Sequence, residues 1–504
     1  MSEPECYRIP LDRYPGMSRF VLDWLSGDER FLPRGGQRPS AVRDNDSRGR
    51  LSSTLIETNK RWGLDVRGEV ERWASGSTFT IVSGQQVGFA GGPLFTLVKL
   101  ASLLKMKRDN EARGVPTTVF FWLATEDHDF AEAATIALPS LEENRQHDLT
   151  WLRATRPADS REVVGRIPIP ESLISQLVNI LTIERPRWLR PGITFGESFA
   201  ELIGTALDGG FILVDSLLPE LRRAGEPLLQ SIVKRWSDMQ SVLAKRSAEL
   251  VRAGYAPQIV PREDASYTLL YKVDGSGNRE LMQRPEAIDA PENISTSAVT
   301  RPLLQDFVLQ PDVFIGGPAE ISYYAQVAPL HQLLNVPMPR VALRGHVLVG
   351  SRHVVRAISR FDIKPEEVFQ TAEQLAAAYE PKGVAAVRSI ADEAERQLKA
   401  EIEKIREISL PADHAVARSI NRSIGHIEYH FKKLTERAIR GLVRKEKEKF
   451  HAMRELVSTF YPDQHVQDRV VAWLPFWLEH GKNLIERLIS EVEPDVPAFK
   501  IVSL

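Results

Sequence analysis

Short apolar runs alternate with longer amphipathic stretches over much of the chain. A β-branched run at residues 78–82 ends at Ser83-Gly84, and Pro93 then opens a stretch with apolar residues at helical intervals. Residues 117–124 follow as a continuous apolar run of strand length. Strands that are apolar on both faces belong to parallel sheets covered by helices. The pattern therefore predicts a strand–helix–strand unit with parallel strands.

Further apolar runs extend this pattern. Three more strands are expected, at residues 211–215, 256–260 and 341–349. Helical patterns separate several of them, which predicts an α/β fold with a Rossmann-like, doubly wound parallel core. Residues 34–50 are rich in Arg, Gly, Asp and Ser and are predicted to form a loop, or to become ordered against another part of the structure. Residues 267–282, with the turn Asp274-Gly-Ser-Gly-Asn278 in their middle, are predicted to form an inserted antiparallel hairpin.

The C-terminal part of the chain has a different pattern. Apolar residues recur in steps of three and four over residues 387–405 and again over residues 420–442, with Pro411 between them. This predicts two long helices that form an antiparallel coiled-coil hairpin, packed within the chain or against a partner copy. The predicted parts are a helical lead-in (1–70), a core (71–365) with insertions at about 140–205 and 262–300, the coiled-coil hairpin (366–460) and a C-terminal segment that docks on the core (461–504).

Charge and composition narrow the function. The 504 residues include 65 basic and 67 acidic side chains, a net charge of −2, whereas nucleic-acid binders usually carry a basic excess. We therefore expect no nucleic-acid partner. Cys6 is the only cysteine, which excludes an intrachain disulfide and a cysteine-ligated zinc site. The sequence has no signal-peptide pattern and no run of roughly 18 apolar residues, so we expect a cytoplasmic protein without a membrane partner.

The first group of candidate residues lies between a predicted strand and the helix that Pro93 opens. Glycines let the backbone approach a ligand there, and the helix dipole favours an anion. Lys99 would face a phosphate or carboxylate. The alternative is a tight glycine-rich turn without a ligand. The candidates are Ser83, Gly84, Gln85, Gln86, Gly92, Pro93, Thr96 and Lys99.

The second group, Glu126-Asp127-His128-Asp129, directly follows the apolar run at residues 117–124. Ligands in open α/β sheets bind beyond the carboxyl ends of the strands, where both groups fall. These side chains can hold an amine or hydroxyls, act as a general base, or bind magnesium. The alternative is an acidic cap for a helix that begins near Ala131. We predict all four as the catalytic group, with Asp127 or His128 as the base, and assign no metal ligands.

A third group surrounds Gly316-Gly317-Pro318, where a loop again enters a helix. Glu320, Tyr323 and Gln326 are expected to project from this helix into one pocket. The alternative is a helix cap with aromatic residues in the core, and His331 is expected to be a packed residue. The candidates are Arg301, Gln305, Asp306, Gly316, Gly317, Pro318, Glu320, Tyr323 and Gln326.

Four motifs in this order resemble the bacillithiol-biosynthesis cysteine-adding enzymes, the BshC family. They are Ser-Gly-Gln-Gln followed by Gly-Pro-x-x-Thr-x-x-Lys (83–99), Phe-Trp-x-Ala-x-Glu-Asp-His-Asp (121–129), Arg-Pro-x-x-Gln-Asp (301–306) and Gly-Gly-Pro-x-Glu-Ile-x-Tyr (316–323). The resemblance extends from residue 83 to about residue 339, and the coiled coil and C-terminal segment also fit it. Gly91-Gly92 differs, because the family often has a bulkier or hydroxyl residue there.

The resemblance implies a carbon–nitrogen ligase that adds L-cysteine to the amine of glucosaminyl-malate and so forms bacillithiol. It also implies a core similar to class I aminoacyl-tRNA synthetases, a homodimer through the coiled coil, and ATP or another nucleotide with magnesium. No HIGH or KMSKS motif is present. Two alternatives remain: a nucleotidyltransferase or sugar-nucleotide enzyme on the same core, and a non-catalytic coiled-coil scaffold with a nucleotide-sensing core.

Overall fold

The chain divides into two compact units, residues 1–352 with 465–504 and residues 353–464, in the computed structural model. The structure describes residues 6–36, 45–139, 149–156, 160–259, 268–283, 287–371, 374, 383–409 and 414–504.

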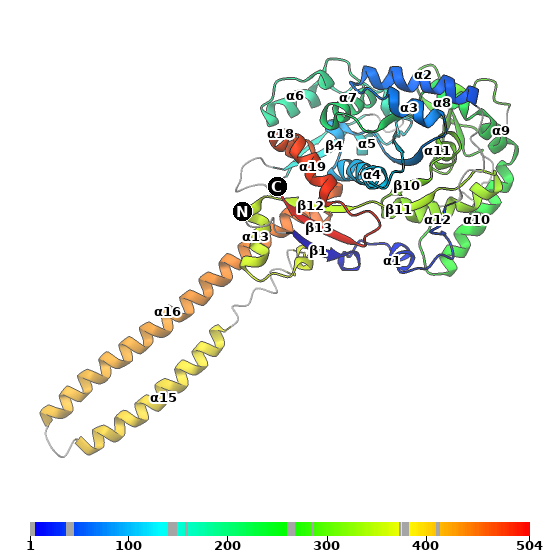
Figure 1. The fold of residues 1–504 in the computed structure, drawn as a ribbon. Coiled ribbons are helices and arrows are strands. Elements are labelled where there is room, and N and C mark those ends of the chain that lie inside the picture. Colours follow the sequence, from blue (N-terminus) through cyan, green and yellow to red (C-terminus); the bar gives the residue numbers. More distant parts are fainter. Residues whose placement is uncertain are drawn as a thin grey trace. The chain divides into compact units, whose positions relative to one another are not determined.

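A parallel sheet forms the centre of the first unit (Figure 1). Among the described residues its strands are, in spatial order, β11 (Arg340–Leu343), β10 (Val313–Gly316), β2 (Phe79–Gln85), β3 (Thr117–Leu123) and β6 (Ile212–Asp215). Read from β6, this is the 3-2-1-4-5 order of a Rossmann fold. The predicted Rossmann-like core is confirmed. The strand order reverses between β2 and β10, and such folds bind ligands at this switch point.

Helices cover the central strands, which explains why the strands are apolar. β3 is buried along its whole length. α4 (Leu94–Ala112) connects β2 to the parallel strand β3, as the sequence predicts. Three more helices pack directly on the sheet: α2 (Asn45–Arg61), α3 (Arg67–Ala74) and α12 (Pro318–Leu333).

Two local predictions are wrong for reasons of tertiary packing. Residues 256–259 form no strand; the side chain of Gln326 pairs with the backbone N–H and carbonyl of Ile259, at 2.9 and 2.6 Å. Residue 260 lies outside the described residues. Residues 45–50, predicted as part of a loop, begin α2, a helix that buries Leu51 and Leu55. Residues 37–44 of that loop also lie outside the described residues.

The strand predicted at residues 341–349 is two strands in different sheets. β11 ends at Leu343, and β12 (His346–Gly350) pairs in parallel with β13 (Ala498–Ser503). β13 also pairs antiparallel with β1 (Cys6–Pro10), so this sheet joins the two ends of the described chain. The chain turns at Gly345, where a Cβ atom would lie 2.9 Å from the Cβ of Val492.

The insertions form two smaller sheets. β4 (Thr135–Pro139) pairs with β5 (Leu149–Arg153). β7 (Leu270–Val273) pairs antiparallel with β8 (Arg279–Leu281) and with β9 (Ile294–Thr296), which confirms the predicted hairpin. Further helices of this unit are α1 (Arg19–Leu25), α5 (Phe130–Ala133), α6 (Glu171–Leu181), α7 (Phe195–Leu207), α8 (Pro219–Ala224), α9 (Glu226–Lys234), α10 (Trp236–Arg252), α11 (Arg301–Leu309), α17 (Gln467–Val470), α18 (Leu474–His480) and α19 (Lys482–Glu491).

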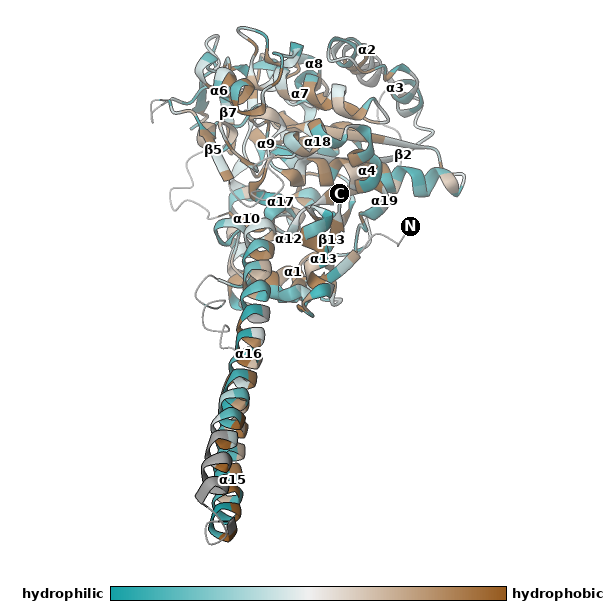
Figure 2. Ribbon diagram, turned by 90° about the vertical axis from the view of Figure 1, so that its left-hand side faces the viewer, coloured by the Kyte–Doolittle hydropathy of each residue, from teal (hydrophilic) through white to brown (hydrophobic). Residues whose placement is uncertain are grey.

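The second unit contains a long helical hairpin, as predicted. α15 (Val384–Ser409) and α16 (His414–Phe460) follow α13 (Arg352–Arg360) and run side by side (Figures 1 and 2). Apolar residues recur between hydrophilic ones along both helices. Ile427 and Leu434 of the predicted second seam are 47% and 64% exposed, so that seam faces α15 only in part. No helix in the described residues has the length and apolar character needed to cross a membrane.

The C-terminal segment closes the loop between β2 and α4. The indole N–H of Trp473 donates to the carbonyl of Gly91 at 2.9 Å, and the N–H of Leu94 donates to the carbonyl of Val471 at 2.8 Å. Gly91 has φ +84°, and a Cβ atom there would lie 2.5 Å from the indole ring. Glycine is therefore required at this position by its backbone conformation and by the close approach of Trp473.

We expect Gly91→Ala to destabilise the core more than Gly114→Ala. Both substitutions place a side chain at positive φ, at a cost of about 1–3 kcal/mol, but no atom lies within 4 Å of the added Cβ at Gly114. Overlap with Trp473 adds about 1–3 kcal/mol at position 91. Urea unfolding of both variants measures the difference. Equal losses of stability would mean that the Trp473 contact adjusts without cost.

Candidate active site

Lys99 occupies the switch point between β2 and β10. Its side chain is 5% exposed, and its ammonium lies 2.7 Å from the carboxylate of Glu320. It also donates to the carbonyl of Gly84 at 2.8 Å and to Oε1 of Gln85 at 3.1 Å. Glu320 in turn accepts from the N–H of Gly317 at 2.8 Å. Lys99 therefore joins the end of β2 to the start of α12.

The two charges of this pair compensate each other inside the protein. Burial lowers the pKa of Lys99, and Glu320 opposes that shift. Burial alone would raise the pKa of Glu320, but the Lys99 ammonium and the Gly317 N–H hold it below its ordinary value. Lys99 was predicted to face a phosphate or carboxylate of a ligand, and the carboxylate that it faces is Glu320.

Both helix starts that were predicted to bind an anion have partners within the protein. The N–H of Leu94 at the start of α4 donates to the carbonyl of Val471, and the N–H of Gly317 at the start of α12 donates to the carboxylate of Glu320. These helix starts therefore offer an anion fewer open donors than the sequence predicts. In the described structure three buried hydroxyls of the predicted groups have no partner: those of Ser83, Thr96 and Tyr323.

Other residues of the first group support the turn itself. A Cβ atom at Gly84 would lie 2.9 Å from the side chain of Trp122, and Gly92 has φ +73°. Pro93 forms a bridge with Ala472 of the C-terminal segment. The amide of Gln86 donates to the carbonyl of Asp129 at 3.1 Å, which links the first group to the second.

Glu126 is buried and takes part in several hydrogen bonds. It pairs with Arg222 of α8 and accepts from the Ser295 hydroxyl at 2.8 Å. The N–H and hydroxyl of Thr296 donate to it at 2.9 and 2.7 Å. Burial would raise the pKa of Glu126, but Arg222 and Arg279 outweigh it and hold it below its ordinary value. Glu126 thus fastens β9 and α8 to the end of β3.

Asp127 and His128 are the more exposed members of the second group, with side chains 37% and 58% exposed. Oδ1 of Asp127 accepts from the N–H groups of His128 at 2.6 Å and Asp129 at 3.3 Å. Burial would raise the pKa of Asp127, but its hydrogen bonds with His128 and Asp129 lower it on balance. Asp127 is therefore an ionised carboxylate near neutral pH, and its contacts in the described structure are all made by Oδ1.

His128 has its ring orientation defined by a neighbouring arginine. Nη1 of Arg279 lies 3.2 Å from its Nδ1. A guanidinium only donates hydrogen bonds, so this contact needs an unprotonated Nδ1, whereas the contact of Nδ1 with Oδ1 of Asp127 at 3.4 Å needs a proton on it. The contact with Arg279 is the shorter of the two, and with it the ring proton of neutral His128 lies on Nε2.

Asp129 caps the helix that follows it. Its carboxylate accepts from the N–H of Glu132 at 3.0 Å, at the start of α5. This is the structural alternative that the sequence leaves open for this residue. Burial and the carboxylates of Asp129 and Asp127 raise the pKa of Glu132.

The third group does not converge on one pocket. Asp306 is buried and accepts from Gln305 at 3.1 Å, Tyr324 at 3.2 Å and His331 at 2.9 Å. His331 is thus a packed residue, as expected.

The remaining members of this group lie at the ends of helices and strands or contact residues outside the group. Gln326 donates to the Ser247 hydroxyl at 2.7 Å and pairs with Ile259, whereas Glu320 turns to Lys99. Gly316 ends β10, Pro318 begins α12 and Arg301 begins α11. Of this group, Arg301 contributes positive charge near Glu320 and Tyr323.

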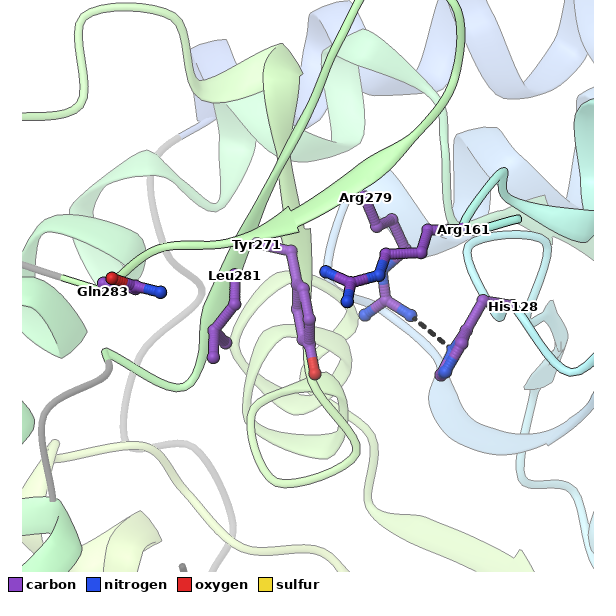
Figure 3. Close-up of a pocket in the computed structure, with 6 residues that line it drawn as sticks. All are labelled: His128, Arg161, Tyr271, Arg279, Leu281 and Gln283. Carbon is purple, nitrogen blue, oxygen red and sulfur yellow. Dashed lines mark hydrogen bonds between the residues drawn. The ribbon is translucent and has the colours of Figure 1, made fainter. Parts of the chain in front are cut away.

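A cavity of about 350 Å³ opens beside His128, and we call it the hairpin pocket (Figure 3). Among the described residues its lining carries positive and aromatic groups but no carboxylate: His128, Arg161, Tyr271, Arg279, Leu281 and Gln283. In the part of the chain that the structure describes, no group of three or more His, Cys, Asp or Glu side chains could hold a metal ion.

Sequence reasoning missed the pocket because two insertions build it. Tyr271 pairs with Leu281 across β7 and β8, and Val273 with Arg279, so one face of the hairpin carries all four side chains. The N–H of Arg279 donates to the carbonyl of Arg161 at 3.0 Å, which aligns the two arginines. The alternation of residues along the predicted hairpin could have shown that Tyr271 and Arg279 share one face. It could not have shown that Arg161 lies beside that face.

The same segment reaches the second group of candidates. Val164 and Gly165 donate to the carbonyls of Asp127 and Thr125 at 2.7 and 2.9 Å. A Cβ atom at Gly165 would lie 2.4 Å from the Cβ of Thr125, so the close approach requires glycine. Residues 161–165 therefore hold the hairpin pocket next to Asp127 and His128.

Comparison with known proteins covers nearly the whole chain. Residues 36–345 match the family described as "Bacillithiol biosynthesis BshC, N-terminal Rossmann-like domain", and residues 347–504 match "Bacillithiol biosynthesis BshC, C-terminal coiled-coil domain". Three similar proteins are named "Putative cysteine ligase BshC". Those of Solibacter usitatus, Koribacter versatilis and Staphylococcus carnosus are 30%, 28% and 27% identical and align over 86%, 97% and 80% of this chain and 86%, 97% and 81% of their own.

We expect Lys99→Met to lower the free energy of unfolding by about 1–3 kcal/mol, because it leaves the Glu320 carboxylate, whose side chain is 25% exposed, without its cationic partner. Removal of both charges in Lys99→Met/Glu320→Gln should recover most of that loss. Urea unfolding of the two variants measures the recovery. A double variant as unstable as Lys99→Met would show that the bonds of Lys99 to β2 matter more than its ion pair.

Proposed function

We propose that this chain, which belongs to the bacillithiol biosynthesis BshC family, is a carbon–nitrogen ligase that joins L-cysteine to the amine of glucosaminyl-malate. The observation that carries the proposal is the match of both parts of the chain to that family, together with relatives named as cysteine ligases over 80% or more of its length. In the reaction, the amine nitrogen attacks the activated carboxyl carbon of cysteine. A C–N bond forms, the activating group leaves, and the nitrogen loses a proton.

Asp127 is the residue that we assign to the amine. Its Oδ2 is open among the described contacts, and its carboxylate is ionised, so it attracts the amine N–H groups. As the C–N bond forms, the attacking nitrogen becomes positively charged and its protons become acidic. A carboxylate in hydrogen-bond contact can then take one of them.

His128 is suited to a different task. Because Arg279 contacts Nδ1, the neutral ring presents an Nε2–H donor at the edge of the hairpin pocket. We assign this donor to a substrate oxygen. Glu126 and Asp129 act by positioning, through β9 and through the start of α5.

The activating group remains a separate proposal, ATP or another nucleotide with magnesium. The residues predicted for a phosphate do not fit it well, because Lys99 pairs with Glu320 and the starts of α4 and α12 have internal partners. Homodimerisation through α15 and α16, and a cytoplasmic location, are likewise proposals that follow from the family.

We expect bacillithiol to form when the purified protein is incubated with L-cysteine, glucosaminyl-malate, ATP and magnesium. Mass spectrometry of the product, with each component left out in turn, identifies the acceptor and the activating nucleotide. Transfer of a nucleotide to a sugar phosphate would favour the nucleotidyltransferase instead. A protein that binds these compounds without any product would favour the scaffold.

We expect Asp127→Asn to lower kcat by roughly 10²- to 10⁴-fold, the usual contribution of a positioned acid–base group, with little change in the KM for cysteine. Because the pKa of Asp127 is lowered, the wild-type rate should lose this contribution only as the pH falls through that lowered pKa. Asp109→Asn, at an exposed carboxylate paired with Lys105, is the matched control. A folded Asp127→Asn protein with the wild-type rate would remove Asp127 from the chemistry.

A further inference from the structure

We propose that the hairpin pocket binds the two carboxylates of the malyl group of the substrate, with Arg161 and Arg279 as the residues that recognise them. This inference rests on the proposed function for the identity of the substrate. The chemistry that it assigns to the pocket rests on the charges and contacts of the pocket itself.

The described lining of the pocket has an excess of positive charge. Its lining holds two guanidinium groups, and within the described residues no carboxylate lies within ion-pair distance of Arg161 or Arg279. Glu126, which acts on Arg279 at longer range, is already paired with Arg222. Asp215 also acts on Arg222, so among the described residues Arg279 shares Glu126 with Arg222 and has no carboxylate of its own. Since an uncompensated buried charge is costly, an anionic ligand would be stabilised there.

Arg279 is held in place before a ligand arrives. It is 6% exposed, its Nη2 donates to the carbonyl of Thr296 at 2.7 Å, and its guanidinium carbon lies 4.0 Å from the centre of the Tyr271 ring. The contact with His128 fixes Nη1. Its Nε is buried and has no partner among the described residues, so one donor of the fixed group remains unsatisfied. A fixed arginine loses little conformational entropy when it binds a carboxylate.

Arg161 supplies the second, adjustable cation. Its side chain is exposed, and the described structure shows no ion pair or hydrogen bond for it. The backbone contact at 3.0 Å places it next to Arg279, and Figure 3 shows both side chains between the Tyr271 ring and the His128 imidazole. Two adjacent guanidinium groups match two carboxylates, because Arg161 can bind one in a bidentate manner and Arg279 keeps an unpaired Nε–H for the other.

The position of the pocket also agrees with the chemistry assigned to Asp127. In glucosaminyl-malate the malyl group is attached to the ring carbon next to the one that carries the amine. His128 lines the pocket, and its Nδ1 lies 3.4 Å from Oδ1 of Asp127. Carboxylates held by the arginines would therefore leave the amine near Asp127. A volume of about 350 Å³ is within the usual range of small-ligand sites.

The test compares two ligands that differ in the carboxylates. Isothermal titration calorimetry of the full chain measures the Kd of glucosaminyl-malate and of methyl glucosaminide, which has the amine but no malyl group. We expect Arg161→Gln to raise the Kd of glucosaminyl-malate by roughly 10- to 100-fold, as for the loss of a charged hydrogen bond, and to leave that of methyl glucosaminide unchanged. Arg252→Gln, at an exposed arginine of α10 that does not line the pocket, should change neither.

Arg279→Lys provides a second variant, because it keeps the charge but loses the planar fork. If the melting temperature shows that this variant folds, its Kd for glucosaminyl-malate should be at least 10-fold higher than that of the wild type. If it does not fold, Arg161→Gln alone decides. The inference is overturned if Arg161→Gln binds glucosaminyl-malate with the wild-type Kd, or if the substitution raises the Kd of both ligands by the same factor.

The outcomes separate this inference from the proposed function. Binding of glucosaminyl-malate that depends on Arg161, without formation of bacillithiol, would support the carboxylate site and reject the ligase. Formation of bacillithiol by the wild type, with unchanged affinity in Arg161→Gln, would support the ligase and reject the carboxylate site.

Discussion

The ion pair between Lys99 and Glu320 is the interaction on which the arrangement of this core depends. It lies where the strand order reverses, between β2 and β10, and joins the end of one strand to the start of the helix that follows the other. Lys99 is buried and Glu320 is largely shielded from solvent, and each offsets the desolvation of its partner. Because this pair fills the position where Rossmann folds commonly contact a ligand, the open polar groups lie beside it, at the end of β3 and on the insertions.

Glu126 extends this arrangement to the insertions. Its hydrogen bonds with Ser295 and Thr296, and its pair with Arg222, attach β9 and α8 to the end of β3. β9 belongs to the same sheet as the β7–β8 hairpin. A buried carboxylate with several donors thus fixes the hairpin that carries Arg279, while the neighbouring Asp127 is only half-buried. Adjacent acids in one motif therefore have different tasks, set by burial and by the number of donors around each.

The sequence allowed the fold to be predicted where the signal is local. The apolar run of β3, the helix after Pro93 and the steps of three and four in α15 and α16 each depend on neighbours within a few residues. The strands expected at residues 256–260 and 341–349 failed because Gln326 and Gly345 redirect the chain through contacts distant in sequence. The candidate site was found in part for the same reason. Asp127 and His128 follow a recognisable strand, whereas Arg161 and Arg279 meet only after two insertions pair.

The contact between Gly91 and Trp473 has a consequence for how the protein is made. The two residues are 382 positions apart, and β1 finds its partner β13 only at the far end of the chain. Domains generally fold during synthesis, N-terminal parts first. Here the first strand–helix turn of the core cannot be completed until Val471 and Trp473 have left the ribosome. A chain that terminates before these residues would therefore leave the turn after β2 open.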